Sequence, residues 1–236
     1  MKVILRGLGR TFIHVFNPTA DLTWTSDTIK ESHKHNIFFQ NIGMNIITGQ
    51  YTSPETVDLL LKTTVFQYRS LFKVTDVYGN LVFKVQSRVF SWLRTATVIL
   101  DANGNPIVTL RHKFRKWLAY KGESISQNDC IFVTKSHPML SWKTRMDVFV
   151  GNSTSKYNCD FIVQGNFWGN KYEIFSGNVE QKNALMANIH GNKTIPFFGG
   201  EKKLLCKVSP NVDQSFVVAL YVILKLDRRS KTKTTD

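Results

Sequence analysis

The sequence has little cysteine and no recognisable catalytic motif. Its three cysteines, Cys130, Cys159 and Cys206, are far apart and show neither the C-x-x-C spacing of a zinc site nor a disulfide framework. The chain also has no H-E-x-x-H, no G-x-S-x-G and no complete phosphate-binding loop. These absences argue against an enzyme. They predict a protein with no catalytic residues, no metal and no cofactor, kept in a reducing compartment.

Acidic residues are scarce as well. The chain has 17 Asp and Glu against 31 Lys and Arg, which gives a formal net charge of +14. No close pair of carboxyl groups suggests acid–base catalysis, and Asp147, Asp160 and Glu173 are too dispersed to predict a calcium site. The excess positive charge instead predicts an anionic partner, such as a membrane surface, a phosphorylated ligand or nucleic acid.

The amino-terminal segment has no secretory signal, because Arg6 and Arg10 interrupt its apolar residues. The protein is therefore expected in the cytoplasm, at the periphery of the plasma membrane or in the nucleus, and not outside the cell. A mitochondrial presequence stays an alternative, since no acid precedes Asp21. Residues 1–46 show neither strand alternation nor hairpin turns, so we expect a disordered extension.

From about residue 57 to 209 the sequence repeats one pattern. A short run of β-branched, aromatic or alternating residues is followed by a turn signal and a further run, as in "LFKVTDV", "YGN" and "LVFKV". Such pairs of runs are typical of β-hairpins. About ten to twelve runs at this spacing predict an all-β barrel or sandwich.

The last ordered segment, "DQSFVVALYVILKLDRR", resembles a membrane anchor followed by a basic stop-transfer cluster. Asp213 is a good N-cap, and the pattern predicts a helix over about 213–226. Such a helix is ~21 Å long, whereas a bilayer core needs ~30 Å or about 20 apolar residues. The segment is therefore too short to span a membrane comfortably.

This helix is apolar on every face, so it should be enclosed on all sides. Its apolar residues are Phe216, Val217, Val218, Ala219, Leu220, Tyr221, Val222, Ile223 and Leu224. A β-barrel could enclose it, because the strands have an apolar face. One example is Leu81, Phe83 and Val85, which alternate with Val82, Lys84 and Gln86. We expect the helix to lie along the axis of a barrel.

Six segments form an ordered series over about residues 49–229. They are "FKVTDVYGNLVFKV", "VILDANGNPIVTLRHK", W-x-x-Y-x-G at Trp117, "LSWKTRMDVFVG", "CDFIVQGNFW" and "VSPNVDQSFVVALYVILKLD". This series resembles the plant LURP-one-related family, whose members share the tubby-like C-terminal fold, related to that of phospholipid scramblases. This chain departs from the family pattern in its extension before residue 47 and in a shorter segment between Lys113 and Trp117.

The resemblance implies a roughly twelve-stranded closed β-barrel around a C-terminal hydrophobic helix. On this basis residues 47–229 are the barrel domain, 1–46 an extension and 230–236 a charged tail. Family members are associated with plant defence and growth regulation, and their biochemical activity is largely undefined. A fold does not by itself fix a function, so the site has to be argued from its residues.

Positive charge is concentrated between residues 77 and 122, where eight Lys or Arg stand against one acid, Asp101. Lys and Arg both bind phosphate oxygens, and a basic cluster gains about 1 kcal/mol per cation at an anionic leaflet. This stretch therefore predicts binding of a phosphoinositide or another anionic membrane lipid. The residues selected for that role are Arg111, Lys113, Arg115, Lys116 and Lys121.

Within this stretch, "IVTLRHKFRKW" is expected to be one strand with an apolar and a basic face. Alternation sends Val108, Leu110 and Phe114 to the first face and Arg111, Lys113 and Arg115 to the second. The result would be a ladder of cations beside Trp117.

Other functions stay open. The basic residues can be a solvated strand edge that prevents edge-to-edge pairing, or a surface for a protein partner. Their interleaving with Phe114, Trp117 and Tyr120 would also suit nucleic acid, although no recognised nucleic-acid motif is present. A further alternative is a lipid-moving or ligand-carrying protein whose barrel opens around its helix.

Overall fold

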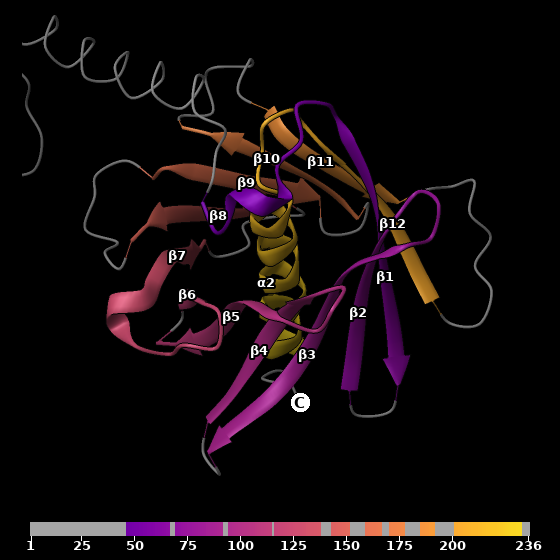
Figure 1. Cartoon of the computed structure of the whole chain (residues 1–236). Helices are drawn as coiled ribbons and strands as arrows, with labels where there is room; N and C mark the ends of the chain where they lie inside the picture. The colour runs from indigo at the N-terminus through magenta and orange to yellow at the C-terminus, as the bar shows by residue number, and fades with distance from the viewer. Residues whose placement is uncertain are drawn as a thin grey trace, which may run out of the picture. The chain divides into compact units, whose positions relative to one another are not determined.

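The computed structural model describes residues 46–66, 69–91, 94–114, 116–137, 143–151, 159–166, 170–177, 185–191 and 201–232. The expected extension before residue 46 and the last four residues of the expected tail lie outside these ranges. Twelve antiparallel strands form a closed barrel, in which each strand pairs with the next in sequence and β12 pairs with β1 (Figure 1). The predicted fold class is confirmed.

The strands are short and evenly spaced, as the repeated turn signals predicted. They are β1 (Val57–Phe66), β2 (Arg69–Asp76), β3 (Leu81–Ser91), β4 (Arg94–Asp101), β5 (Pro106–Lys113), β6 (Lys116–Lys121), β7 (Cys130–Ser136), β8 (Lys143–Val150), β9 (Phe161–Asn166), β10 (Lys171–Ser176), β11 (Leu185–Gly191) and β12 (Glu201–Val208). Two short 3₁₀ helices, η1 (Gly49–Tyr51) and η2 (Gln127–Asp129), precede β1 and β7, and the helix α2 (Gln214–Thr232) follows β12.

The helix α2 runs through the ring of strands (Figure 1). Every residue from Phe216 to Ile223 is at most 2% exposed. The ring of Phe216 lies 5.3 Å from that of Phe132 on β7 and 5.0 Å from that of Phe161 on β9. The predicted central helix is therefore the core of the barrel. The structure contains no helix of sufficient length and apolarity to cross a bilayer among the residues that it describes.

The helix α2 begins at Gln214, next to the expected start at residue 213, and extends past the expected end at 226, to Thr232. Its last turns carry Arg228, Arg229 and Lys231 in the sequence. Arg and Lys are good helix formers, and cations are favourable near a helix C-terminus. An apolar pattern predicts which part of a helix is buried, so it does not show where a helix that continues into charged residues ends.

Strand alternation gives most of the inward side chains correctly. Phe83 and Val85 on β3 are buried, whereas Leu81 is 36% exposed because it is the first residue of its strand. Cys206 is buried in the apolar core on β12, and burial raises the pKa of its thiol to about 12. It is a packing residue with almost no thiolate at neutral pH.

Two hairpins share the same turn, D-x-x-G-N. Asp76 Oδ1 accepts hydrogen bonds from the backbone N–H of Tyr78 and Asn80, at 2.9 and 2.8 Å, and Asp101 Oδ1 accepts one from Asn105 at 2.7 Å. The hydrogen bonds from the following Asn side chains are the main cause that lowers the pKa of both carboxyl groups. Both turns, after β2 and β4, lie at the barrel end where α2 begins.

The carboxylate of Asp213 joins the start of α2 to the segment before β1. Its Oδ1 accepts from the backbone N–H of Ser215 and Phe216, at 2.9 and 3.3 Å. Its Oδ2 accepts from those of Ile47 and Thr48, at 2.8 and 3.0 Å. Burial raises the pKa of Asp213, and these hydrogen bonds oppose that rise. The residue is thus both the predicted helix N-cap and a clamp across the barrel end.

Replacing an apolar residue of α2 by an acid should abolish folding, because the barrel interior has no partner for a buried charge. We expect Val218→Asp and Leu220→Asp to give no soluble protein, measured as the soluble fraction after expression. Val77→Asp is the matched control, since Val77 is 52% exposed and should tolerate the change. A soluble and well-folded Leu220→Asp protein would show that α2 is not core.

Asp213→Ala should lower the free energy of unfolding by about 1–3 kcal/mol, because it removes the helix cap and leaves buried N–H groups unpaired. Urea denaturation followed by circular dichroism measures this change. Glu55→Ala is the control, because Glu55 is exposed and its hydrogen bond to Ser53 Oγ comes from the backbone N–H, which alanine keeps. An unchanged midpoint for Asp213→Ala would contradict the clamp.

Candidate anion-binding face

The segment "IVTLRHKFRKW" is not one strand. β5 ends at Lys113 and β6 begins at Lys116, and these two residues pair across the turn. The prediction that Phe114 shares a strand face with Val108 and Leu110 is therefore wrong: those two are fully buried, whereas Phe114 is 85% exposed, with a φ of 48°. Arg115 lies outside the described residues. Alternation alone could not reveal this turn, because it contains none of the Gly, Asn or Asp residues that usually mark a two-residue hairpin.

The turn brings lysines from three strands into one row. Lys113 pairs with Lys116, and Lys116 pairs with Lys135 of β7. Directly opposite residues project from the same face of a sheet, and neighbouring strands are ~4.8 Å apart, so the lysine row of Lys113, Lys116 and Lys135 extends over ~10 Å. The alternate residues Leu110 and Ala119 are fully buried against the core, so the row faces outward.

Arg111 shares the outward face, two residues before Lys113, and is half-buried. Lys121 is at the other end of β6, where it pairs with Val108, about 16 Å from Lys116 at ~3.3 Å per residue. Trp117 is 8% exposed and packs in the core, with its ring 5.1 Å from that of His112. The structure thus brings together Arg111, Lys113 and Lys116 but not Lys121, and Trp117 lies on the opposite face from the cations.

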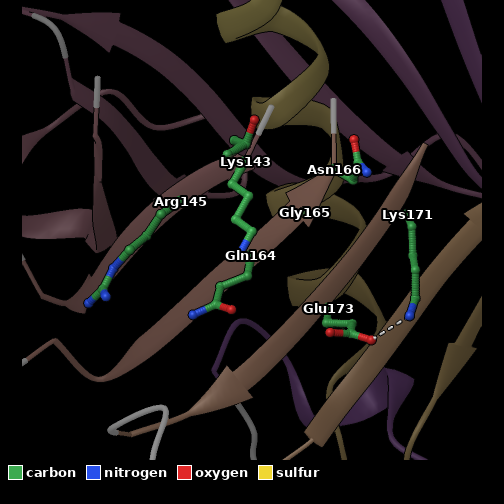
Figure 2. Close-up of a pocket in the computed structure, with 8 residues that line it drawn as sticks. Lys143, Arg145, Gln164, Gly165, Asn166, Lys171 and Glu173 are labelled. Carbon is green, nitrogen blue, oxygen red and sulfur yellow. Dashed lines mark ion pairs between the residues drawn. The ribbon is translucent and has the colours of Figure 1, made fainter. Parts of the chain in front are cut away.

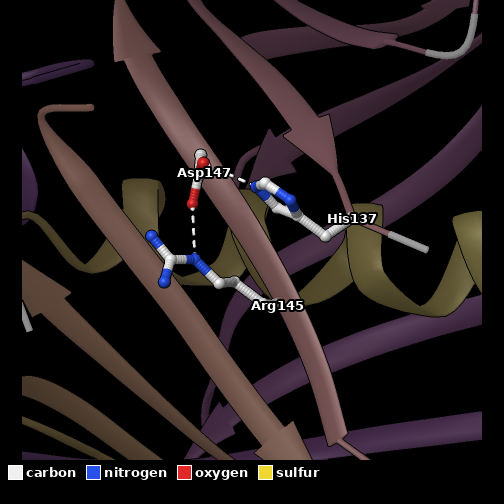
Figure 3. A network of polar contacts seen from close by, with 3 residues as sticks. All are labelled: His137, Arg145 and Asp147. Atoms are coloured by element: carbon white, nitrogen blue, oxygen red, sulfur yellow. Dashed lines mark hydrogen bonds and ion pairs between the residues drawn. The ribbon is translucent and has the colours of Figure 1, made fainter. Parts of the chain in front are cut away.

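The lysine row ends at an acid that is already paired. Lys135 is opposite Asp147 of β8. His137 Nε2 lies 2.6 Å from Asp147 Oδ2, and Arg145 Nε donates to Asp147 Oδ1 at 3.0 Å (Figure 3). In Figure 3 the contact between Arg145 and Asp147 is made by Nε of the arginine. The carboxylate therefore holds the arginine by that nitrogen, and the arginine side chain stays 47% exposed.

A polar groove of about 530 Å³ continues this surface across β8, β9 and β10. Its polar side chains are Lys143, Thr144, Arg145, Gln164, Asn166, Lys171 and Glu173 (Figure 2). Lys171 Nζ lies 3.1 Å from Glu173 Oε1, so the acid of the groove has a cationic partner. The groove therefore offers mostly hydrogen-bond donors, a composition that suits a phosphate or carboxylate group.

Turns at one end of the barrel hold acidic residues, and those at the other end are flanked by basic residues. The turns at the end where α2 begins hold Asp76, Asp101, Asp129 and Asp160. The turns at the opposite end, called here the basic end, are flanked by Lys113, Lys116, Lys143 and Lys171. Near this end, Lys225 of α2 lies 3.4 Å from Asn170, in the turn before β10. An electrostatic potential of opposite sign at the two ends would orient the molecule on a charged surface.

A second set of lysines was missed by sequence reasoning. Cross-strand pairing puts Lys203 opposite Lys62, Lys62 opposite Lys73 and Lys73 opposite Lys84, on strands β12, β1, β2 and β3. No salt bridge with these four is found among the described residues. This lysine ladder comes from strands at both ends of the sequence, so only the closure of the barrel brings it together.

The described residues show no constellation for catalysis. His137 and Asp147 resemble the base and orienting acid of a hydrolase, but no Ser, Thr or Cys side chain is hydrogen-bonded to His137 in the described part of the chain. Within the same residues, no group of three His, Cys, Asp or Glu could hold a metal ion. The feature that distinguishes this face is its row of cations.

Comparison with known proteins identifies relatives in a plant. Protein LURP-one-related 15 of Arabidopsis thaliana is 34% identical over 185 residues, which cover 76% of this chain and 83% of that protein. Protein LURP1 of the same plant is 29% identical, covering 76% of this chain and 87% of its own length. A crystal structure of an Arabidopsis thaliana protein has a TM-score of 0.60 and 31% identity, covering 76% of this chain and 96% of its own.

The names of these relatives state neither an enzymatic activity nor a ligand. The sequence profile that describes the LURP-one-related family matches residues 57–225, from the first residue of β1 into α2. This range includes every strand of the barrel and its buried helix. The predicted resemblance is confirmed, and the chain belongs to the LURP-one-related family.

Proposed function

We propose that this protein is a non-enzymatic regulator that binds anionic membrane lipid, phosphoinositides above all, at the basic end of its barrel. The observation that carries the proposal is the lysine row, in which three cations from three strands stand in register on one outward face. Like charges directly opposite one another destabilise a sheet. A bound phosphate group would convert this repulsion into attraction.

The surroundings of the row support a lipid headgroup as the ligand. Arg111 flanks the row, and the polar groove beside it adds Lys143, Arg145 and Lys171. Each cation near an anionic leaflet contributes about 1 kcal/mol, so several together give useful affinity without a deep pocket. Asp76, Asp101, Asp129 and Asp160 lie in turns at the other end of the barrel, where they would not repel the membrane. The two acids near the row, Asp147 and Glu173, are each paired with a cation.

Binding of this kind would be reversible and sensitive to salt, since it depends on screened charges. We propose the cytoplasmic face of the plasma membrane as its location, because that leaflet carries the negative surface potential. The family resemblance to plant regulators supports a role in defence or growth signalling, with the barrel as a lipid-dependent tether for a protein partner.

Two other functions have less support. A nucleic-acid surface needs exposed aromatic rings for stacking. Of the three aromatic residues predicted for that role, Trp117 and Tyr120 are 8% and 4% exposed, so only Phe114 is available. A lipid-carrying barrel needs space inside, whereas the side chains of α2 fill the interior from Phe216 to Ile223. A ligand could enter only by displacing that helix from its contacts.

Removing the lysine row should weaken membrane binding. We expect the triple variant Lys113→Gln, Lys116→Gln and Lys135→Gln to bind vesicles of phosphatidylcholine and phosphatidylinositol bisphosphate about a hundredfold more weakly, from about 1 kcal/mol per cation. Co-sedimentation with vesicles at several salt concentrations measures the change. Vesicles of phosphatidylcholine alone should bind neither protein.

The matched control removes the same charge elsewhere on the barrel. Lys62→Gln, Lys73→Gln and Lys203→Gln take three positive charges from the lysine ladder. This variant should bind the same vesicles within about threefold of the original, a difference of less than 1 kcal/mol. Equal losses in the two triple variants would show that binding follows net charge alone, and the proposed site would be wrong.

A further inference from the structure

The turn between β5 and β6 carries an aromatic residue where the backbone disfavours it. The φ of Phe114 is 48°, in the left-handed region that residues other than Gly, Asn and Asp rarely adopt. Two-residue hairpin turns with such backbone angles usually contain Asn-Gly or Asp-Gly. The ring is also 85% exposed. Phe114 therefore opposes folding twice, through backbone strain and through apolar surface left in water.

The neighbours of the ring are cations. Lys113 Nζ lies 5.7 Å from the centre of the Phe114 ring. Lys113 and Lys116, the two ends of the turn, belong to the lysine row, which continues to Lys135. The hairpin thus presents an apolar ring at its tip and positive charge directly behind it. Interfacial membrane segments combine the same two features, apolar rings below the headgroups and basic side chains among them.

The position of Phe114 on the barrel is distinctive. The other large apolar side chains that are exposed in the described structure are Val77, Tyr78, Leu81, Val150 and Leu185. All five lie in or beside turns at the end where α2 begins. Among the side chains whose exposure the structure describes, Phe114 is therefore the one large exposed apolar side chain at the basic end.

We propose that Phe114 inserts into the interfacial region of an anionic lipid bilayer while the lysine row binds the headgroups. This inference rests on the proposed function and adds an apolar anchor to it. The lysine row attracts the anionic bilayer at a distance, and the Phe114 ring is buried in the interfacial region on contact. The strained turn holds the ring outward, so the free protein does not have to rearrange before it binds.

Substituting Asn for Phe114 should separate stability from binding. Asn tolerates the left-handed region and removes the ring, so Phe114→Asn should raise the thermal midpoint by roughly 2–4 °C. The same variant should bind vesicles containing phosphatidylinositol bisphosphate about tenfold more weakly, because part of the burial of a phenyl ring is lost. The dependence of affinity on salt should stay unchanged, since every cation of the lysine row remains.

Phe114→Trp should report insertion directly. We expect its emission to shift to shorter wavelength on vesicle binding and to be quenched by lipids brominated on their acyl chains. The signal is taken as the difference from the unsubstituted protein, which has five tryptophans of its own. Tyr78→Asn is the matched control, because Tyr78 is 89% exposed at the opposite end of the barrel and its loss should leave vesicle affinity unchanged.

The outcomes distinguish this inference from the proposed function. If Phe114→Asn binds vesicles normally while the triple Lys→Gln variant of the lysine row does not, the insertion is wrong and the lipid site stands. If neither variant changes vesicle binding, both proposals fail. A Phe114→Asn protein that is less stable than the original would contradict the strain argument, and an unquenched Trp at this position would contradict insertion.

Discussion

The nine apolar residues of α2 cannot remain in water, and the rest of the barrel depends on their enclosure. A helix that is apolar on one face needs one neighbouring layer, whereas a helix that is apolar on all faces needs a wall around its whole circumference. The twelve strands supply that wall and leave no free sheet edge. At one end, Asp213 fixes the first turn of the helix to the segment before β1, so the core and the wall are joined through a buried carboxylate.

Closure of the barrel also places acidic and basic residues at different ends of its surface. In an antiparallel ring, successive turns lie at opposite ends, so the charged residues of the turns determine the charge of each end. Turns at the end where α2 begins use Asp to accept backbone N–H groups, and this end becomes acidic. The other end carries the lysine row, the polar groove and the last turns of α2, and becomes basic. An anionic surface is therefore expected to approach the protein at its basic end.

The basic end also contains features that do not serve folding. Lysines opposite one another repel, and Phe114 combines a disfavoured φ with a ring in water. A very stable interior can hold such features, because the side chains around α2 are almost all buried. The same core explains why the β5–β6 hairpin can present a ring and its cations in a fixed arrangement. In this protein the interior provides stability, and the membrane-facing functions proposed above lie on the outer surface.

Sequence patterns alone predicted the strands and the enclosed helix, because both are local features, whereas the closed twelve-stranded barrel was implied by the family resemblance. Alternation gave the strands, and the unbroken run from Phe216 to Leu224 required enclosure. The candidate site was predicted only in part. The turn at Phe114 lacks the usual turn residues, so the cations beside it were assigned to one strand. The pairing of β6 with β7 adds Lys135 to the lysine row, and the pairing of β6 with β5 puts Lys121 far from it. The lysine ladder joins strands at opposite ends of the chain. Tertiary structure decided these neighbours because cross-strand contacts depend on register and closure, which no local pattern contains.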